Sequence, residues 1–158
     1  HPHYWQDKGM IKIREARPAE AAVIAEFNQA MALETENKQL EDQVILAGVT
    51  RMIQDPELGF YLVALVDDDI AGCLAITTEW SDWRDGIFWW IQSVYVAQEF
   101  RGKGVFSRLY QRVKDLAKQD EGVCGIRLYA EKENERAIRT YRRLGMTVTD
   151  YRLLEEAF

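Results

Sequence analysis

An apolar strand that runs into a glycine turn and then a helix constrains this chain most strongly. Val94–Val96 is apolar and strand-like, Arg101–Gly104 reads Arg-Gly-Lys-Gly, and apolar residues recur at helical spacing over Val105–Lys118. Glycines leave backbone amides bare, and a helix start carries unpaired N–H groups and partial positive charge. The segment therefore predicts a seat for a phosphate group, with Arg101 and Lys103 adding positive charge. The alternative at this point is a plain strand–turn–helix junction.

The other apolar patterns predict strands and helices that fit one α/β (α+β layered) domain around a mixed sheet. Expected strands are Ile11–Arg14, Phe60–Val66, Ile70–Thr78, Ile87–Val96, Ile126–Ala130 and Thr147–Leu154. Expected helices are Ala19–Leu33, Glu41–Gln54, Val105–Lys118 and Asn134–Leu144. The order is β-α-α-β-β-β-α-β-α-β. No further strand follows the closing one, so one edge of the sheet is left without a partner strand. A second subunit could cover this edge, which favours a homodimer.

A second motif follows in the last predicted helix. Asn134, Ala137 and Tyr141 recur at spacings of three and four, so they share one helix face that opens at Asn134. Gly145 fits the end of that helix and is followed by Met146. Taken alone, Asn134 is either a helix cap or a ligand contact. Tyr141 is either a packed aromatic ring or a functional phenol.

With both motifs present, the chain resembles the GNAT superfamily of acyl-CoA-dependent N-acetyltransferases. The family carries R/Q-x-x-G-x-G/A after its fourth strand and N-x-x-A-x-x-x-Y-x-x-x-G-F/M around its fourth helix. This chain has Arg101-x-x-Gly104, then Phe106 where the family prefers a small residue, and the second motif in full. The resemblance is strong over Gly72–Leu154, and Trp80–Val96 looks like the signature of a bacterial subgroup. It implies the GNAT fold, a mixed, mostly antiparallel sheet of about six or seven strands flanked by about four helices.

The resemblance implies acetyl-CoA as co-substrate. Backbone groups of Val94 and Val96 would pair with the pantetheine arm as a missing strand does, and amides of the turn would hold the diphosphate. The bulky Phe106 must then point away from the phosphates into the core. The implied cofactor-binding residues are Val94, Tyr95, Val96, Arg101, Gly102, Lys103, Gly104, Val105, Phe106, Ser107, Asn134, Ala137 and Tyr141.

Acetyl transfer to an amine needs a neutral amine, a polarised carbonyl and a stabilised thiolate. The resemblance implies that Tyr141 protonates the thiolate as general acid. Many relatives place a basic glutamate on the fourth strand, but Phe88–Ser93 holds no acid. Candidate bases or amine-attracting acids are therefore Glu34, Glu36, Glu79 and Asp82, with Gln92 or Ser93 as candidates for orienting a water molecule. Each acid taken singly also reads as a solvated surface group.

The resemblance implies acetyl transfer to a primary amine of a small molecule or peptide, and we expect direct attack in a ternary complex because no cysteine lies near the proposed thioester. A non-catalytic acyl-CoA-binding or sensing module is the alternative, since the fourth strand lacks an acid. A phosphate or nucleotide site unrelated to CoA is a third hypothesis, resting on the glycine turn alone. Four tryptophans lie close together in the sequence, at positions Trp80, Trp83, Trp89 and Trp90. They either line the amine site, where their rings would contact the cation, or pack in the core or at a dimer interface. The second interpretation is favoured because Trp89 and Trp90 must lie on opposite faces of one strand.

The net charge and its distribution along the chain indicate which classes of partner the protein can bind. The net charge is −6, which disfavours nucleic acid as a partner. Gln98–Arg143 carries twelve Lys and Arg against seven Asp and Glu, whereas the rest carries eight against nineteen. This division suits a polyanionic cofactor on one side and a cationic acceptor on the other, although acidic surfaces also serve solubility alone.

No apolar run reaches the length of about 20 residues that spans a bilayer, and no signal peptide pattern is present. Cys73 and Cys124 lie in apolar strands without CxxC spacing, so we expect buried free thiols, no metal site and a cytoplasmic protein. Residues 1–9, before Met10, are interpreted as a cloning remnant, and 10–158 as a single GNAT domain.

Overall fold

The computed structural model describes residues 10–158. They fall into two compact units, one ending at Leu128 and one spanning Tyr129–Phe158. Residues 1–9, interpreted above as a remnant, lie outside the described residues. That interpretation and the single-domain assignment both stay predictions.

A five-stranded mixed sheet forms the centre of the first unit. Its strands are β1 (Ile11–Glu15), β2 (Phe60–Val66), β3 (Asp69–Ser81), β4 (Gly86–Val96) and β5 (Val123–Leu128), in the spatial order β1-β2-β3-β4-β5. The first three pairings are antiparallel, and β4 pairs with β5 in parallel. Asp67 and Asp68 join β2 to β3 with φ of 51° and 69°, the left-handed backbone that tight hairpins require.

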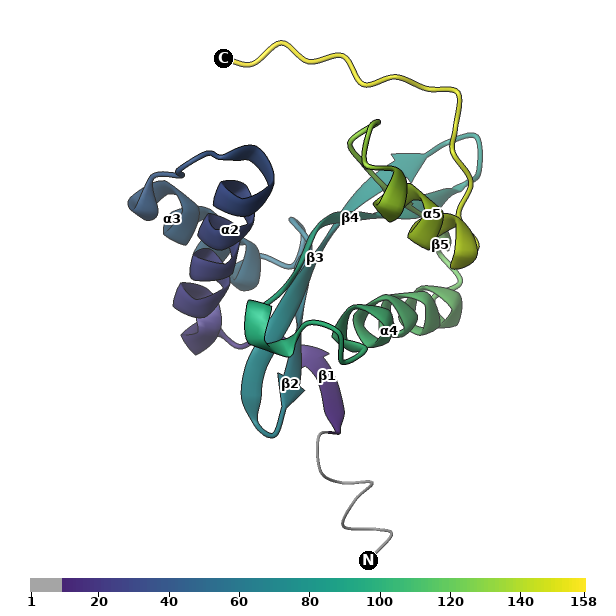
Figure 1. Ribbon diagram of the computed structural model, residues 1–158. Helices are drawn as coiled ribbons and strands as arrows, with labels where there is room; N and C mark the ends of the chain where they lie inside the picture. Colours follow the sequence, from purple (N-terminus) through teal and green to yellow (C-terminus); the bar gives the residue numbers. More distant parts are fainter. Residues whose placement is uncertain (1–9) are drawn as a thin grey trace, which may run out of the picture. The chain divides into compact units, whose positions relative to one another are not determined.

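Helices cover both faces of this sheet, as Figure 1 shows. On one face α2 (Ala21–Glu36) and α3 (Asp42–Gln54) pack over a core that includes Ile24, Val49 and Val63. On the other face lies α4 (Val105–Gln119), which buries Leu109 and Val113 completely. Because β4 and β5 are parallel, the chain needs a crossover between them, and α4 supplies it.

The second unit holds α5 (Glu135–Arg143), and no strand follows it among the described residues. The predicted closing strand Thr147–Leu154 is therefore wrong, and the sheet has five strands rather than six or seven. The segment's alternating pattern suits a strand, but its apolar side chains find no surface to cover: Tyr151 is 79% and Leu154 88% exposed. The predicted order is confirmed from the first strand through the last helix.

Gly48 offers a test of this fold in α3. It is exposed in the helix interior, and a Cβ there would meet no atom within 4 Å. Because Gly costs a helix about 0.5–1 kcal/mol relative to Ala, we expect Gly48→Ala to raise the free energy of unfolding by that amount in denaturant titration. The matched control Gly59→Ala should destabilise strongly, since its Cβ would collide with the carbonyl oxygen of Ile76. Loss of stability in Gly48→Ala would contradict the placement of α3.

The two cysteines differ in burial, which gives a second test. Cys73 is 3% exposed, and burial raises the pKa of its thiol to about 12. Cys124, near the start of β5, is only half-buried. Because the thiolate is the reactive form, an aromatic disulfide reagent at pH 8 should label Cys124 quickly and Cys73 only as the protein unfolds. In Cys124→Ser the fast phase should vanish, whereas a fast phase that persisted would show Cys73 to be accessible.

Candidate functional site

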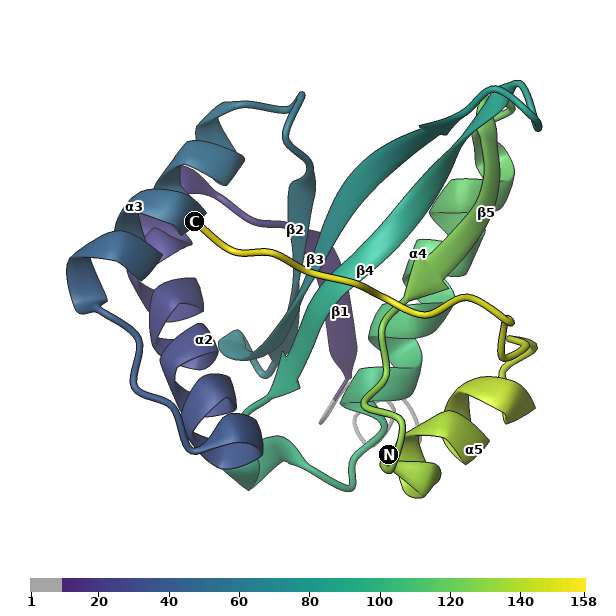
Figure 2. The same cartoon turned by 90° about the horizontal axis from the view of Figure 1, so that it is seen from above.

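The opening between β4 and β5 is the first feature of the site. Their pairing ends at Ile91 and Leu128, although β4 continues to Val96, and Figure 2 shows the two strands diverging. The N–H of Ala97 donates to the carbonyl of Ala71 at 2.8 Å. Since hydrogen-bonded pairs alternate along an antiparallel ladder, the N–H and C=O groups of Val94 and Val96 face away from β3. They therefore present a strand edge in the opening.

A β-bulge lies beside this opening. Ala75 pairs with Ser93 and Ile76 with Ile91, so Gln92 is the extra residue in β4. The Gln92 side chain donates to Thr77 Oγ1 at 2.7 Å. Both residues that the sequence offered for orienting a water molecule, Gln92 and Ser93, thus lie where β4 parts from β5.

The glycine turn after β4 presents bare backbone. Gly102 and Gly104 have φ of 78° and 84°, and a Cβ at either would meet no atom within 4 Å. These glycines are needed for their left-handed backbone and not for internal space. The first hydrogen bond of α4 runs from the Arg108 N–H to the Gly104 carbonyl at 3.1 Å. The three amides from Val105 to Ser107 precede that bond and form the anion-attracting end of the helix.

Phe106 and Lys103 both direct their side chains against neighbouring rings. Phe106 is half-buried, and its ring stacks on Tyr110 with centroids 6.5 Å apart. Lys103 is exposed, and its Nζ lies 5.7 Å from the centre of the Phe100 ring. The bulky side chain at 106 therefore lies along α4, against Tyr110.

Arg101 binds the protein itself. Its Nε donates to the Val96 carbonyl at 2.9 Å, and its guanidinium forms an ion pair with Glu34 at 2.7 Å. Glu34 also accepts a hydrogen bond from the Tyr95 hydroxyl at 2.5 Å. The sequence did not predict these contacts between Arg101, Glu34 and Tyr95, because α2 and the end of β4 are far apart in the chain.

These contacts decide the protonation of Glu34. The hydrogen bond from Tyr95, and then that from Arg101, hold the pKa of Glu34 below its ordinary value. The carboxylate lies in the last turn of α2, where the helix dipole disfavours negative charge, and Arg101 offsets this. Glu34 is thus a persistent anion and a weak proton acceptor.

A second cluster surrounds Glu79 on the adjoining strands. Glu79 Oε1 accepts from Trp90 Nε1 at 3.2 Å and from Arg127 at 2.8 Å. The Arg127 guanidinium lies 3.6 Å from the centre of the Phe88 ring. By strand register Glu79, Phe88 and Trp90 share the face that α2 and α3 partly cover, so this cluster adjoins the bulge at Gln92.

The four candidate acids do not gather at one point. Glu34 binds Arg101, and Glu79 binds Arg127. Glu36 is exposed at the end of α2, and Asp82 is exposed in the turn between β3 and β4. Among residues 10–158, no group of three or more His, Cys, Asp or Glu could hold a metal ion.

The four tryptophans are likewise dispersed. Trp83 and Trp80 are 90% and 62% exposed near the tip of the β3–β4 hairpin. Trp89 packs edge-on against Phe60, with ring centroids 5.3 Å apart, whereas Trp90 binds Glu79. Strand alternation places Trp89 and Trp90 on opposite faces.

In the second unit, Asn134 caps α5. Its side chain accepts a hydrogen bond from the Ala137 N–H at 3.1 Å. Ala137 and Tyr141 follow one turn apart on the helix, and Gly145 ends it with φ of 107°. The capping interpretation of Asn134 therefore holds in this structure.

The comparison with known proteins decides the family. A profile described as the Acetyltransferase (GNAT) family matches residues 13–146. The chain belongs to the GNAT acetyltransferase family. One solved structure, a possible acetyltransferase from Clostridium difficile 630, is 44% identical over 94% of this chain and 98% of its own, with a TM-score of 0.89. No curated protein sequence matches.

More distant solved structures share the fold alone. An aminoglycoside N-acetyltransferase solved in complex with CoA is 15% identical, covers 94% of this chain and 95% of its own, and has a TM-score of 0.76. A transcriptional regulator from Bacillus halodurans C-125 is 22% identical, covers 94% of this chain and 100% of its own, and has a TM-score of 0.78.

A helix that crosses a membrane must be both long and apolar. Within residues 10–158 of this GNAT chain, no helix meets both requirements.

Proposed function

We propose that this GNAT chain moves an acetyl group from acetyl-CoA to a primary amine of a small molecule or peptide. The amine attacks the thioester directly while both substrates are bound. The observation that carries the proposal is the edge of β4 at Val94 and Val96, which β5 does not cover, followed directly by the bare turn at Gly102–Gly104 and the amides of the first turn of α4.

These parts suit the two chemical halves of CoA. The pantetheine arm carries amide groups that pair with the β4 edge as a strand would, with Tyr95 between the two pairing residues. The diphosphate takes the amides of Val105, Phe106 and Ser107, which the left-handed glycines leave uncovered. Lys103, exposed beside the turn, adds a cation. Arg101 serves by fixing the end of β4, since its guanidinium is bound to Glu34.

Tyr141 acts as general acid toward the departing thiolate, as the matching family tyrosine does. Ala137, with its small side chain, precedes it by one turn, and Asn134 caps the start of their helix. A phenol suits this step because its hydroxyl can donate a proton to the departing sulfur.

On the acceptor side, the acids attract the cationic amine, and one of these carboxylates takes its proton through a water molecule. Gln92 and Ser93 orient that water at the β4 bulge. Among the acids, Glu79 adjoins the β4 bulge by strand register and is held there by Trp90 and by its ion pair with Arg127. Glu34 is ion-paired, and Glu36 and Asp82 contribute charge from the margin of the acceptor side.

The burial and position of the two cysteines favour direct attack by the amine over an acyl-enzyme route. An acyl-enzyme route needs a thiolate near the thioester. Cys73 is buried with a pKa of about 12, so it stays a neutral thiol at physiological pH. Cys124 lies in the closed part of the β4–β5 pairing, at the register shift between Val123 and Gly125 and away from the opening at Ile91.

A non-catalytic acyl-CoA-binding module is the second candidate. It is favoured by the absence of an acid on β4 and by the ion pairs that occupy both Glu34 and Glu79. Thiol release from acetyl-CoA, measured across a panel of amines beside calorimetry with CoA, separates the two. Amine-dependent release supports the transferase, whereas tight CoA binding without release on any amine supports the module. An ADP affinity equal to that of CoA would instead favour a general phosphate site.

The finer assignments belong to the same proposal. We assign the chain to the subgroup with a Trp80–Val96-like segment, to a single domain over 10–158 and to the cytoplasm, where acetyl-CoA and free thiols occur together. Among residues 10–158, β5 pairs with β4 alone, and the edge that this leaves suits a homodimer.

A further inference from the structure

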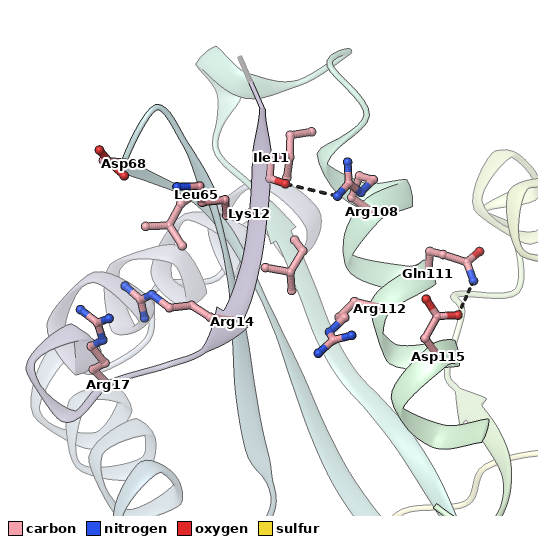
Figure 3. A pocket seen from close by; sticks show the side chains of 11 residues that line it. Ile11, Lys12, Arg14, Arg17, Leu65, Asp68, Arg108, Gln111, Arg112 and Asp115 are labelled. Atoms are coloured by element: carbon pink, nitrogen blue, oxygen red, sulfur yellow. Dashed lines mark hydrogen bonds between the residues drawn. The ribbon is translucent and has the colours of Figure 1, made fainter. Parts of the chain in front are cut away.

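A groove of about 880 Å³ lies apart from the features described above, between the edge strand β1 and α4 (Figure 3). Its walls come from β1, from the outer side of α4 and from the β2–β3 turn. The lining residues that carry charge are Lys12, Arg14, Arg17, Asp68, Arg108, Arg112 and Asp115.

The groove is basic in a protein whose net charge is −6. Arg14 is neutralised by Glu20 at 2.6 Å, and Asp115 accepts a hydrogen bond from Gln111. Lys12 and Arg112 are exposed and form no ion pair among residues 10–158. They therefore offer two cations on opposite sides of β1, with Lys12 on the face of the sheet that α2 and α3 cover and Arg112 on α4.

The outer edge of β1 adds backbone hydrogen-bonding groups to these cations. The Ala16 N–H donates to the Tyr61 carbonyl at 2.9 Å, which fixes the phase of the β1–β2 ladder. By alternation, Ile11, Ile13 and Glu15 direct their N–H and C=O groups away from β2. The Ile11 carbonyl accepts from Arg108 at 3.3 Å, as Figure 3 shows, which agrees with this phase.

From the two features together, we propose that this groove binds an acidic peptide segment of a partner as an added strand along β1. The backbone groups of Ile13 and the N–H of Glu15 pair with the peptide, and its carboxylates meet Lys12 and Arg112. An acidic peptide can use both the cations and the strand edge. A polyphosphate or nucleic acid would bind the cations but would leave the backbone groups of the β1 edge without a partner. A second copy joined β1 to β1 would bring the Lys12 side chains of both copies to the same edge, where like charges repel.

The test uses the full chain and a fluorescein-labelled peptide, Glu-Glu-Val-Glu-Glu-Val, in fluorescence anisotropy. Two matched peptides accompany it, one with alternate backbone amides N-methylated and one with Lys in place of Glu. We expect the acidic peptide to bind and both matched peptides to bind at least about tenfold more weakly, with affinity falling as salt is added. Lys12→Glu and Arg112→Glu should each weaken binding by about tenfold, whereas Lys118→Glu, in the last turn of α4, should not.

Amide hydrogen exchange on the same complex supplies the strand-specific readout. The amides of Ile13 and Glu15 should exchange more slowly when the acidic peptide is bound. The proposal is overturned if the N-methylated peptide binds as well as its parent, if Lys12→Glu and Arg112→Glu leave binding unchanged, or if inorganic polyphosphate displaces the peptide and the two amides show no protection. That last result would identify a general polyanion site.

Discussion

Replacing Tyr141 with Phe is expected to lower kcat for acetyl transfer by about 10²- to 10⁴-fold, the range of general acid catalysis. The substitution removes one hydroxyl and keeps the aromatic ring, so packing on α5 should survive. CoA affinity should therefore stay within about twofold, because the cofactor is held chiefly by backbone groups of other elements. Steady-state thiol release gives kcat, and calorimetry with CoA gives the affinity.

Tyr151→Phe is the matched control for this prediction. It removes the same hydroxyl from a residue that is 79% exposed in the same unit of the chain, so kcat should not change. Unaltered kcat in Tyr141→Phe would remove the phenol from the mechanism. A parallel loss of activity and CoA binding would give Tyr141 a structural role instead.

The second large effect is expected at Gly104, the residue that precedes α4. Its φ of 84° disfavours any side chain, and a valine there would stand over the bare amides that follow. We expect Gly104→Val to weaken CoA binding by about ten- to hundredfold, equivalent to about 1.4–2.8 kcal/mol. S-acetylpantetheine lacks the diphosphate, so its reaction rate should change far less than that of acetyl-CoA.

Gly145→Ala controls for backbone strain alone, since Gly145 has φ of 107° in the second unit. It should lower stability and leave CoA affinity unchanged. If Gly104→Val bound CoA as tightly as the parent chain, or if both acyl donors lost rate equally, the diphosphate would not lie on the amides of this turn.

Local physical chemistry made much of this site predictable. The strand, turn and helix around Gly102–Gly104 follow from β-branched residues, glycine backbone freedom and helical periodicity, all of which act over a few neighbours. The cap formed by Asn134 is equally local, since its side chain reaches only to Ala137. Such features depend on few residues and are visible in the sequence.

Contacts between distant segments were not predictable in this way. Arg101 was expected above the turn and is bound to Glu34, because the fold brings the end of α2 beside the end of β4. The pairing of Glu79 with Arg127 likewise needs the register of three strands. Thr147–Leu154 alternates as a strand does, yet a strand also needs a partner edge, which its own sequence cannot specify.

A crystal structure with bound CoA tests the central claim most directly. We predict the diphosphate on the amides from Val105 to Ser107, the pantetheine arm along Val94–Val96 and the sulfur within hydrogen-bond reach of the Tyr141 hydroxyl. A structure with the diphosphate in the groove between β1 and α4, or with the Tyr141 hydroxyl directed away from the sulfur, would contradict it.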